Sequence, residues 1–335
     1  AMMELSKAEM FGLADRAGIS AMIRQDGSLE LYMSDAAFRA ARRDWDLCGK
    51  HGVPFEHVSG ARMAELQPGL SPSVTAATFA PSWSHVSDPK DFGKAIWAYA
   101  ERLGARFVKG DAALVRGREG GGHAVLKDGT ELSGDALVIA AGAWSHRLAR
   151  QLGDEIPLET ERGYNTTLPK NAFDAKRMLI FSADAFVLTP LENGIRIGGA
   201  VELAGLDNPP NFKRAKAMLT KAKRYLPGLN AEGGTEWMGF RPSLPDTLPA
   251  IGRAKAAVRT VRQRLHQQPA PRKGHRGHPH RARRQVPLAQ FGVTLPHGTQ
   301  GPQVRLARKR RPQGLQARVH HQGLRDLERL HAPGR

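Results

Sequence analysis

Three small residues at the end of an apolar run could allow a ligand to lie against the main chain. Residues 135–142 read Asp-Ala-Leu-Val-Ile-Ala-Ala-Gly, a pattern that predicts a strand buried on both faces of a parallel sheet. Ala140, Ala141 and Gly142 at its carboxyl end leave space beside the backbone. Nucleotides bind at this edge of open α/β sheets. Tight packing of the strand is the alternative that these residues leave open.

A second candidate is Arg241, in the segment Gly239-Phe240-Arg241-Pro242. Its guanidinium is planar and always charged, so it can pair with a carboxylate through two parallel hydrogen bonds. The sequence therefore offers a binding group for an anionic substrate. A structural ion pair at a strand end is the competing interpretation.

Other reactive groupings are not found in the sequence. It shows no Ser/His/Asp arrangement and no spacing of metal ligands, so we expect no metal site. His275, His278 and His280 form a short histidine tract, but they lie in a C-terminal segment of atypical composition. The single cysteine, Cys48, excludes a disulfide framework and favours a reducing compartment.

The elements that would position these residues follow two different patterns along the chain. Helices are expected where polar caps precede apolar residues at helical spacing, over 5–17, 34–49, 61–66, 87–103, 145–152 and 211–226. A hairpin is expected over 21–33, and further strands over 74–79, 105–108, 112–116, 123–126, 131–133, 135–142, 158–168, 178–181, 186–190, 195–202 and 235–241. An α/β stretch thus interrupts an α+β stretch, which predicts a discontinuous two-domain fold.

The net charge is confined to the last quarter of the chain. Residues 1–252 contain 30 Lys and Arg and 30 Asp and Glu, whereas residues 253–335 contain 20 basic and 2 acidic residues. The overall charge of +18 therefore says nothing about partners of the first 252 residues. Arginines of the basic segment could contact nucleic-acid phosphates, and such binding would be non-specific and salt-sensitive.

The basic segment is also unlike a folded domain in composition. Residues 258–335 are too poor in apolar residues to offset their chain entropy, so we expect disorder with at most short helices such as 314–330. We expect that deleting them leaves the folding of residues 1–252 unchanged or improved. A frame break near 253–258 is the preferred explanation, and a basic arm or a lineage-specific extension stays open.

Four segments taken together resemble the FAD-dependent D-amino-acid oxidase and dehydrogenase superfamily, especially its bacterial D-amino-acid dehydrogenases. They are GARFVKGDAALV, DALVIAAGAWSHRLARQLG, IPLETERGY and TEWMGFRPSLPDTLPAIG, in that order, within residues 1–252. The resemblance implies a flavoprotein fold with an FAD-binding Rossmann-like domain and an antiparallel-sheet substrate domain. It assigns 1–86 and 155–247 to the substrate domain and 87–154 to the FAD domain. Residues 248–335 would return to the FAD domain, where the basic segment stands instead.

The resemblance also implies roles for individual residues. Ala141, Gly142, Ala143 and Trp144 would lie against FAD, and the backbone of Ala113 would face the adenine. Arg241 would hold the carboxylate of a D-amino acid, which is oxidised to a 2-oxo acid and ammonia by hydride transfer to the flavin. Two further residues are weaker candidates for the substrate site: Tyr164, for which a packed interface tyrosine is an equal alternative, and His85, at a domain crossing.

Two family features are missing from this sequence. One is a Gly-rich Gly-His-Gly segment, which by the resemblance would reach the flavin ring and the substrate and which the basic segment replaces. No Gly-x-Gly-x-x-Gly occurs, although this fingerprint binds the dinucleotide pyrophosphate in the family. We therefore expect a fragment, truncated in front, that retains no stoichiometric FAD and is inactive by itself. The alternative is a non-catalytic protein derived from the fold, with a nucleic-acid-binding tail. We expect a cytoplasmic location; peripheral contact with the inner face of the membrane and the identity of the electron acceptor stay open.

Overall fold

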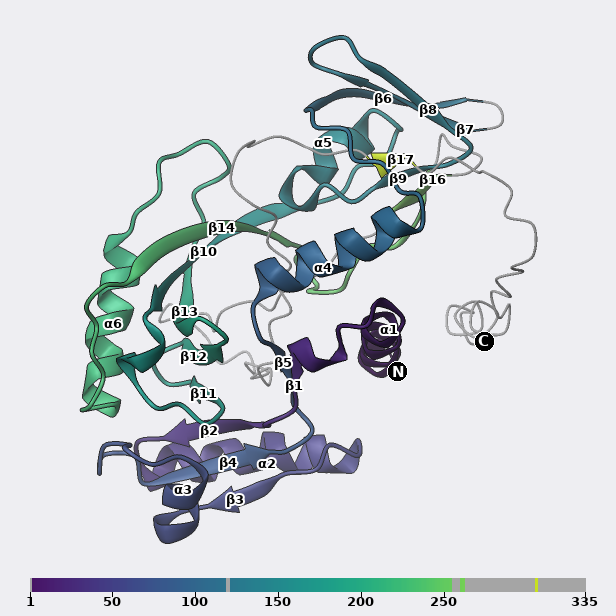
Figure 1. The fold of residues 1–335 in the computed structure, drawn as a ribbon. Helices are drawn as coiled ribbons and strands as arrows, with labels where there is room; N and C mark the ends of the chain where they lie inside the picture. The colour runs from purple at the N-terminus through teal and green to yellow at the C-terminus, as the bar shows by residue number, and fades with distance from the viewer. Residues whose placement is uncertain (1, 119–120, 255–259, 263–304, 307–335) are drawn as a thin grey trace, which may run out of the picture.

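The largest element of the molecule is a mixed β-sheet. The computed structural model describes residues 2–118, 121–254, 260–262 and 305–306 (Figure 1). Eight strands form this sheet in the order β14 (Thr235–Ser243), β10 (Glu159–Leu168), β13 (Gly194–Glu202), β12 (Phe186–Leu191), β11 (Met178–Phe181), β2 (Ser28–Tyr32), β4 (Ala76–Ala80) and β3 (Glu56–Val58). Neighbours are antiparallel except β2 and β11, which join the two chain segments in parallel. Residues remote in sequence thus form one sheet.

Helices cover parts of this sheet where the sequence pattern requires it. Helix α6 (Lys213–Tyr225) packs against β10 and β13, with Ala215, Met218 and Ala222 turned into the core. Helix α2 (Asp35–Lys50) begins at Ser34, whose hydroxyl accepts a hydrogen bond from the Ala37 N–H at 3.2 Å. The short helix α3 (Gly60–Leu66) lies beside β4.

A second group of elements lies beyond one end of the large sheet. Strands β6 (Ala112–Arg118), β7 (Gly121–Leu126) and β8 (Glu131–Gly134) form an antiparallel sheet. Strand β9 (Leu137–Ile139) leads through the 3₁₀ turn η2 (Gly142–Trp144) into α5 (Ser145–Arg150). These elements enclose their own small core, which includes Val115, Leu137 and Leu148. The long strands β10 and β14 connect the two groups (Figure 1).

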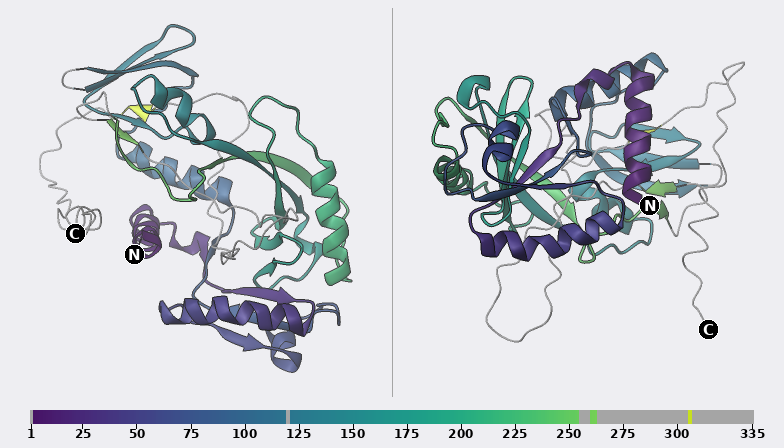
Figure 2. Two further views of the ribbon diagram at one scale, coloured as in Figure 1. Left: turned by 180° about the vertical axis from the view of Figure 1, so that it is seen from behind. Right: turned by 90° about the horizontal axis from the view of Figure 1, so that it is seen from below.

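Two helices lie to the side of this connection. Helix α4 (Pro89–Arg102) begins at Asp88, whose carboxylate accepts hydrogen bonds from the N–H groups of Lys90 and Asp91. Helix α1 (Met2–Ala17) packs on α4, next to the short strands β1 (Ile23–Arg24) and β5 (His85–Val86), which pair with each other. In Figure 1 and in the left view of Figure 2, α6 lies on one side of β10 and α4 on the other. The remaining 3₁₀ turns are η1 (Ser20–Met22) and η3 (Lys170–Ala172).

Most expected elements are present, and the mixed α/β plus α+β class is confirmed. Two local expectations are wrong. The segment 21–33 does not form a hairpin, because β1 pairs with β5 while β2 pairs with β4 and β11. Residues 105–108 form no strand, and Phe107 and Val108 are exposed without a partner strand in the described part of the chain. The domain boundaries stay a prediction.

Two short places of the basic segment form strands, and its expected disorder stays a prediction. Strand β16 (Thr260–Arg262) lies parallel to β9, and β17 (Arg305–Leu306) lies antiparallel on its other side. Strand β15 (Gly252–Arg253) pairs with β16. The other residues beyond 262, including the expected helix at 314–330, lie outside the described residues. Among the described residues, no helix is both long and apolar enough to cross a membrane.

Candidate active site

The site is built on one face of the paired strands β10 and β14. Three register pairs follow one another along this face: Glu161 with Arg241, Gly163 with Gly239, and Asn165 with Trp237. Side chains on a strand alternate between faces, so alternate residues share one face. This is the face opposite to α6, and we call it the Arg241 face. At its centre the Gly163–Gly239 pair lies between two pairs of residues with larger side chains.

The two glycines form a floor on which larger side chains lie. A Cβ atom at Gly163 would come within 2.5 Å of the Arg241 guanidinium carbon. A Cβ atom at Gly239 would overlap the indole of Trp237. The guanidinium and the indole therefore fold toward each other over the glycine pair. Both glycines are needed because of this close approach, and neither serves a turn.

Arg241 is a half-buried cation without a close partner. It makes no hydrogen bond or ion pair with any other described residue. Burial lowers the pKa of its guanidinium, and the negative charge of Glu161 partly opposes that effect. A guanidinium has such a high ordinary pKa that it keeps its charge. The site thus holds a positive charge that Glu161 offsets only in part and that no ion pair joins among the described residues, so its donors are available to an anion.

Acceptor atoms near Arg241 are also left without partners. Glu161 Oε2, Asn165 Oδ1 and Ser243 Oγ are buried atoms that form no hydrogen bond in the described structure. All three residues belong to the Arg241 face, because Ser243 pairs with Glu159 two positions along the register. Buried polar atoms are nearly always hydrogen-bonded in folded proteins. Two hydroxyls on the opposite face of β10, Thr160 Oγ1 and Thr166 Oγ1, are also without partners, so it is the position of these three atoms beside the guanidinium that makes them candidate contacts for a polar ligand.

Tyr164 lies on the other face of β10, in the core beneath α6. It is 1% exposed, packs edge-on against Phe212, and donates a hydrogen bond to Glu202 Oε2 at 2.5 Å. Its hydroxyl also accepts a hydrogen bond from the Asn211 N–H. The structure therefore does not bring Tyr164 beside Arg241, and it supports the packing alternative.

Arg162, next to Tyr164, is a fully buried arginine whose guanidinium is bound by main-chain atoms of the protein. Its three guanidinium nitrogens donate to the carbonyl oxygens of Gly205, Asn208 and Pro209 at 2.6–3.0 Å. Its side chain also lies over the ring of Phe240, 5.5 Å from the centroid. Arg162 thus ties the loop after β13 to the end of β14. Sequence reasoning missed it, since its partners are main-chain atoms of a remote loop.

The expected cofactor residues gather around the end of β9. Gly142 has a φ of +54° and open space where a Cβ would stand, so only glycine fits this turn without strain. Trp144 packs edge-on against Phe240, with ring centroids 5.2 Å apart. Phe240 directly precedes Arg241 in β14, so this end of the small-residue strand meets the strand that carries Arg241. Ala141 and Ala143 are buried there.

A smaller cavity adjoins this turn. It has a volume of about 240 Å³ and is lined by Ala143, His146, Thr160 and the loop 205–207, among others. Farther away, the carbonyl of Ala113 accepts a hydrogen bond from the Gln151 side chain at 3.1 Å, and the same amide accepts one from the Val115 N–H. The exposed edge of β6 is thus held by Gln151. The adenine contact expected at Ala113 stays a prediction.

His85 lies apart from these groups. It is 7% exposed in β5, opposite Arg24, and its Nδ1 has no hydrogen-bond partner in the described structure. Burial lowers the pKa of its imidazole, although Asp26 and a hydrogen bond to the Pro190 backbone act in the opposite direction. Among its described interactions, none reaches Arg241. A role in catalysis therefore gains no support.

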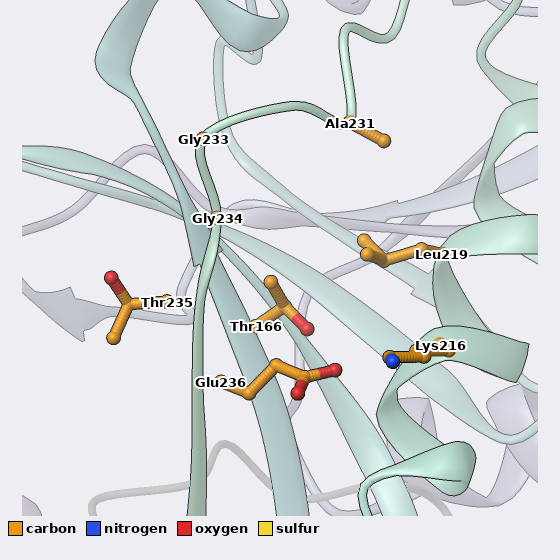
Figure 3. Close-up of a pocket in the computed structure, with 8 residues that line it drawn as sticks. All are labelled: Thr166, Lys216, Leu219, Ala231, Gly233, Gly234, Thr235 and Glu236. Atoms are coloured by element: carbon orange, nitrogen blue, oxygen red, sulfur yellow. The ribbon is translucent and has the colours of Figure 1, made fainter.

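Another cavity lies on the α6 side of the sheet. It measures about 560 Å³ and is lined by Thr166, Lys216, Leu219, Ala231, Gly233, Gly234, Thr235 and Glu236 (Figure 3). Thr166 and Glu236 are a register pair whose side chains face α6, so this cavity is on the face opposite to Arg241. The described residues contain no group of three or more side chains suited to hold a metal ion.

Comparison with known proteins identifies the class that this fold and site define. Among solved structures, the glycine oxidase of Geobacillus kaustophilus superimposes with a TM-score of 0.68 and 20% identity, covering 78% of this chain and 70% of that one. The L-proline dehydrogenase of P. horikoshii gives a TM-score of 0.64 and 20% identity, covering 76% and 70%. The chain therefore shares the fold of these two enzymes.

The sequence comparisons identify the family. Residues 1–268 match the model of the DAO family, described as FAD dependent oxidoreductase, and the chain belongs to this family. A D-amino-acid oxidase of Bradyrhizobium diazoefficiens is 33% identical over 253 residues, covering 73% of this chain and 59% of that protein. A D-amino acid dehydrogenase of Sinorhizobium medicae is 27% identical over 262 residues, covering 76% and 62%. The chain thus spans about three-fifths of the length of these relatives.

The described residues fit the edge of a flavin cofactor. Beside Gly142 the main chain is open, and the buried hydroxyl of Ser145 at the start of α5 has no partner in the described structure. A flat ring or a phosphate oxygen can be accommodated by such groups. Gly142, Ala143, Trp144 and Ser145 are the residues that would hold FAD on this side.

Proposed function

We propose that the Arg241 face binds the carboxylate of a D-amino acid, which FAD oxidises to a 2-oxo acid and ammonia. The observation that carries this proposal is the half-buried guanidinium of Arg241, which lies on the Gly163 floor and has no ion-pair partner among the described residues. Burying an unpaired charge is costly, so such a group is retained where a ligand completes it. The names of the relatives, D-amino-acid oxidase and D-amino acid dehydrogenase, support the choice of substrate.

The protein's part in this chemistry is orientation. FAD supplies the acceptor for the hydride of the substrate α-carbon. The bidentate clamp of Arg241 fixes the carboxylate, and the buried strand pair fixes Arg241. Trp237, folded over Gly239 on the same face, would limit the positions that a bound amino acid can take.

Binding to the purified chain tests the proposal without depending on flavin. Titration with D-alanine should change the tryptophan fluorescence, because Trp237 lies on the Arg241 face, over Gly239, which pairs with Gly163. Arg241→Met should weaken D-alanine binding about 30-fold or more, since a charge-assisted bidentate contact contributes roughly 2–4 kcal/mol. Ethylamine, which lacks the carboxylate, should not bind either protein.

Turnover gives a second measure. With added FAD and a dye acceptor, the proposal expects conversion of D-alanine but not L-alanine to pyruvate, and loss of this conversion in Arg241→Met. Because the sequence has no dinucleotide fingerprint, we expect the flavin to be lost on gel filtration. Equal D-alanine affinity in wild type and Arg241→Met would assign Arg241 to structure and refute the proposed function.

A further inference from the structure

We propose that Glu161 binds the ammonium group of the amino acid whose carboxylate Arg241 binds. The Arg241–Glu161 pair would then select zwitterionic α-amino acids over hydroxy acids and simple carboxylates. This inference rests on the proposed function of the Arg241 face and adds a second charged residue that determines which substrates bind.

The register of the two strands places these charges side by side. Glu161 and Arg241 are directly opposite each other in β10 and β14. Opposed residues in an antiparallel pair have Cβ atoms about 4.5–5.5 Å apart. Both side chains project from the same face. A carboxylate and an ammonium on one α-carbon are close enough together to be bound by neighbours at this spacing.

The two side chains do not bind each other, although their positions would permit it. The Arg241 side chain turns along the strand direction and lies over Gly163. No hydrogen bond or ion pair joins it to Glu161 in the described structure, yet the charge of Glu161 affects the guanidinium pKa. The charges of Glu161 and Arg241 are thus near enough to interact, but they are not paired. A site that binds a zwitterion needs this arrangement, because each charge must be available to the opposite charge of the ligand.

The carboxylate of Glu161 lacks a hydrogen-bond donor at one of its oxygen atoms. Its Oε2 atom is buried and has no hydrogen-bond partner among the described residues. Desolvation of an unpaired carboxylate oxygen is unfavourable, and an ammonium donor would relieve it. A ligand with only a carboxylate would pair Arg241 and leave Glu161 unpaired. An α-amino acid pairs both groups at once.

A simpler role for Glu161 would be to neutralise Arg241. In that role a direct, hydrogen-bonded pair is the favourable arrangement, and the structure does not have it. The two roles also predict different binding. A neutralising Glu161 would weaken all carboxylates alike, so Glu161→Gln would strengthen D-alanine and D-lactate equally. An ammonium-binding Glu161 predicts that the two ligands change in opposite directions or by very different factors.

The experiment compares two ligands that differ only in this group. D-Alanine and D-lactate share their carbon skeleton and carboxylate, and lactate carries a hydroxyl in place of the ammonium. Their dissociation constants are measured by calorimetry or tryptophan fluorescence for wild type, Glu161→Gln and Arg241→Met. We expect Glu161→Gln to weaken D-alanine at least 10-fold and to leave D-lactate unchanged or tighter. Arg241→Met should weaken both.

Glu159→Gln is the matched control. Glu159 lies two residues earlier on the same strand, and its Oε1 already accepts a hydrogen bond from the Thr160 N–H at 2.8 Å. This variant should keep the wild-type ratio of the two affinities. Glu161→Asp retains the carboxylate one methylene shorter and should give an intermediate ratio; it serves as the second variant if Glu161→Gln does not fold.

The outcomes separate the two proposals. An unchanged ratio of D-alanine to D-lactate affinity in both Glu161 variants, with binding still dependent on Arg241, overturns the role of Glu161 and leaves the proposed function intact. If wild type binds neither ligand, or if Arg241→Met binds both normally, the proposed function fails and the inference fails with it. A collapse of the ratio in Glu161→Gln alone supports both.

Discussion

The guanidinium of Arg241 occupies the space over Gly163 that a side chain at position 163 would fill. A Cβ atom at Gly163 would stand 2.5 Å from both the guanidinium carbon and one of its terminal nitrogens. The position of the candidate substrate-binding cation is therefore determined by the absence of a side chain on the neighbouring strand. Gly163 has no positive φ and makes no turn, so this close approach is its evident reason to be glycine.

Replacing Gly163 by alanine tests this relationship. The added methyl would displace the Arg241 guanidinium, which is the far end of a flexible side chain and can move. We therefore expect a folded protein whose D-alanine affinity falls at least 10-fold, or about 1.4 kcal/mol. Stability should change little, because alanine suits a strand at least as well as glycine. Dissociation constants and urea midpoints measure the two effects.

Gly228→Ala is the control for this variant. Gly228 follows α6, has no positive φ, and would present its Cβ to open space. This change should alter neither binding nor stability by much. Normal D-alanine affinity in Gly163→Ala would show that the guanidinium does not need its place over the glycine.

The site was accessible to sequence reasoning only in part. Arg241 and the small residues at 140–142 can be predicted as candidates because their chemistry is visible in single short segments. The capped helices at Ser34 and Asp88 were found for the same reason, since a cap is local. Each of these features depends on residues within a few positions of each other.

What could not be predicted depends on pairing between remote strands. The partners of β1 and β2 lie far along the chain, so the hairpin expected over 21–33 does not form. The proximity of Glu161 and Gly163 to Arg241 is apparent only when β10 is aligned with β14. A signal did exist in the spacing: Glu-x-Gly at 161–163 and Gly-x-Arg at 239–241 match when two antiparallel strands are put in register.

Arg162 should contribute stability where Arg241 contributes binding. Arg162→Met would leave the carbonyl oxygens of Gly205, Asn208 and Pro209 without their donors inside the protein. Removing one partner of a buried charged network costs about 3–5 kcal/mol. We expect a lower urea midpoint and faster proteolysis of the loop 203–211, which this arginine holds.

The control for Arg162 is a surface arginine that shares Glu202 with it, since Arg162 Nη1 lies 3.8 Å from Glu202 Oε2. Arg214 contacts Glu202 at 3.3 Å, but its side chain is 41% exposed, so Arg214→Met should cost at most about 1 kcal/mol. Equal losses of stability in the two variants would mean that the carbonyl contacts of Arg162 contribute little.

The burial of His85 predicts how stability depends on pH. Its pKa is lowered in the folded protein, so the unfolded chain, with an ordinary histidine pKa of about 6.5, binds more protons near that pH. Stability therefore rises with pH through this range and is lost as the pH falls below about 6.5. Urea midpoints measured between pH 5.5 and 7.5 should increase with pH in the wild type. His57, whose pKa burial also lowers, adds to the same trend.

His85→Gln removes one of these two histidine contributions, so the urea midpoints of the variant should depend less steeply on pH, whatever its absolute stability. Parallel curves for wild type and variant would show that His85 accepts a proton as readily in the folded protein as in the unfolded chain.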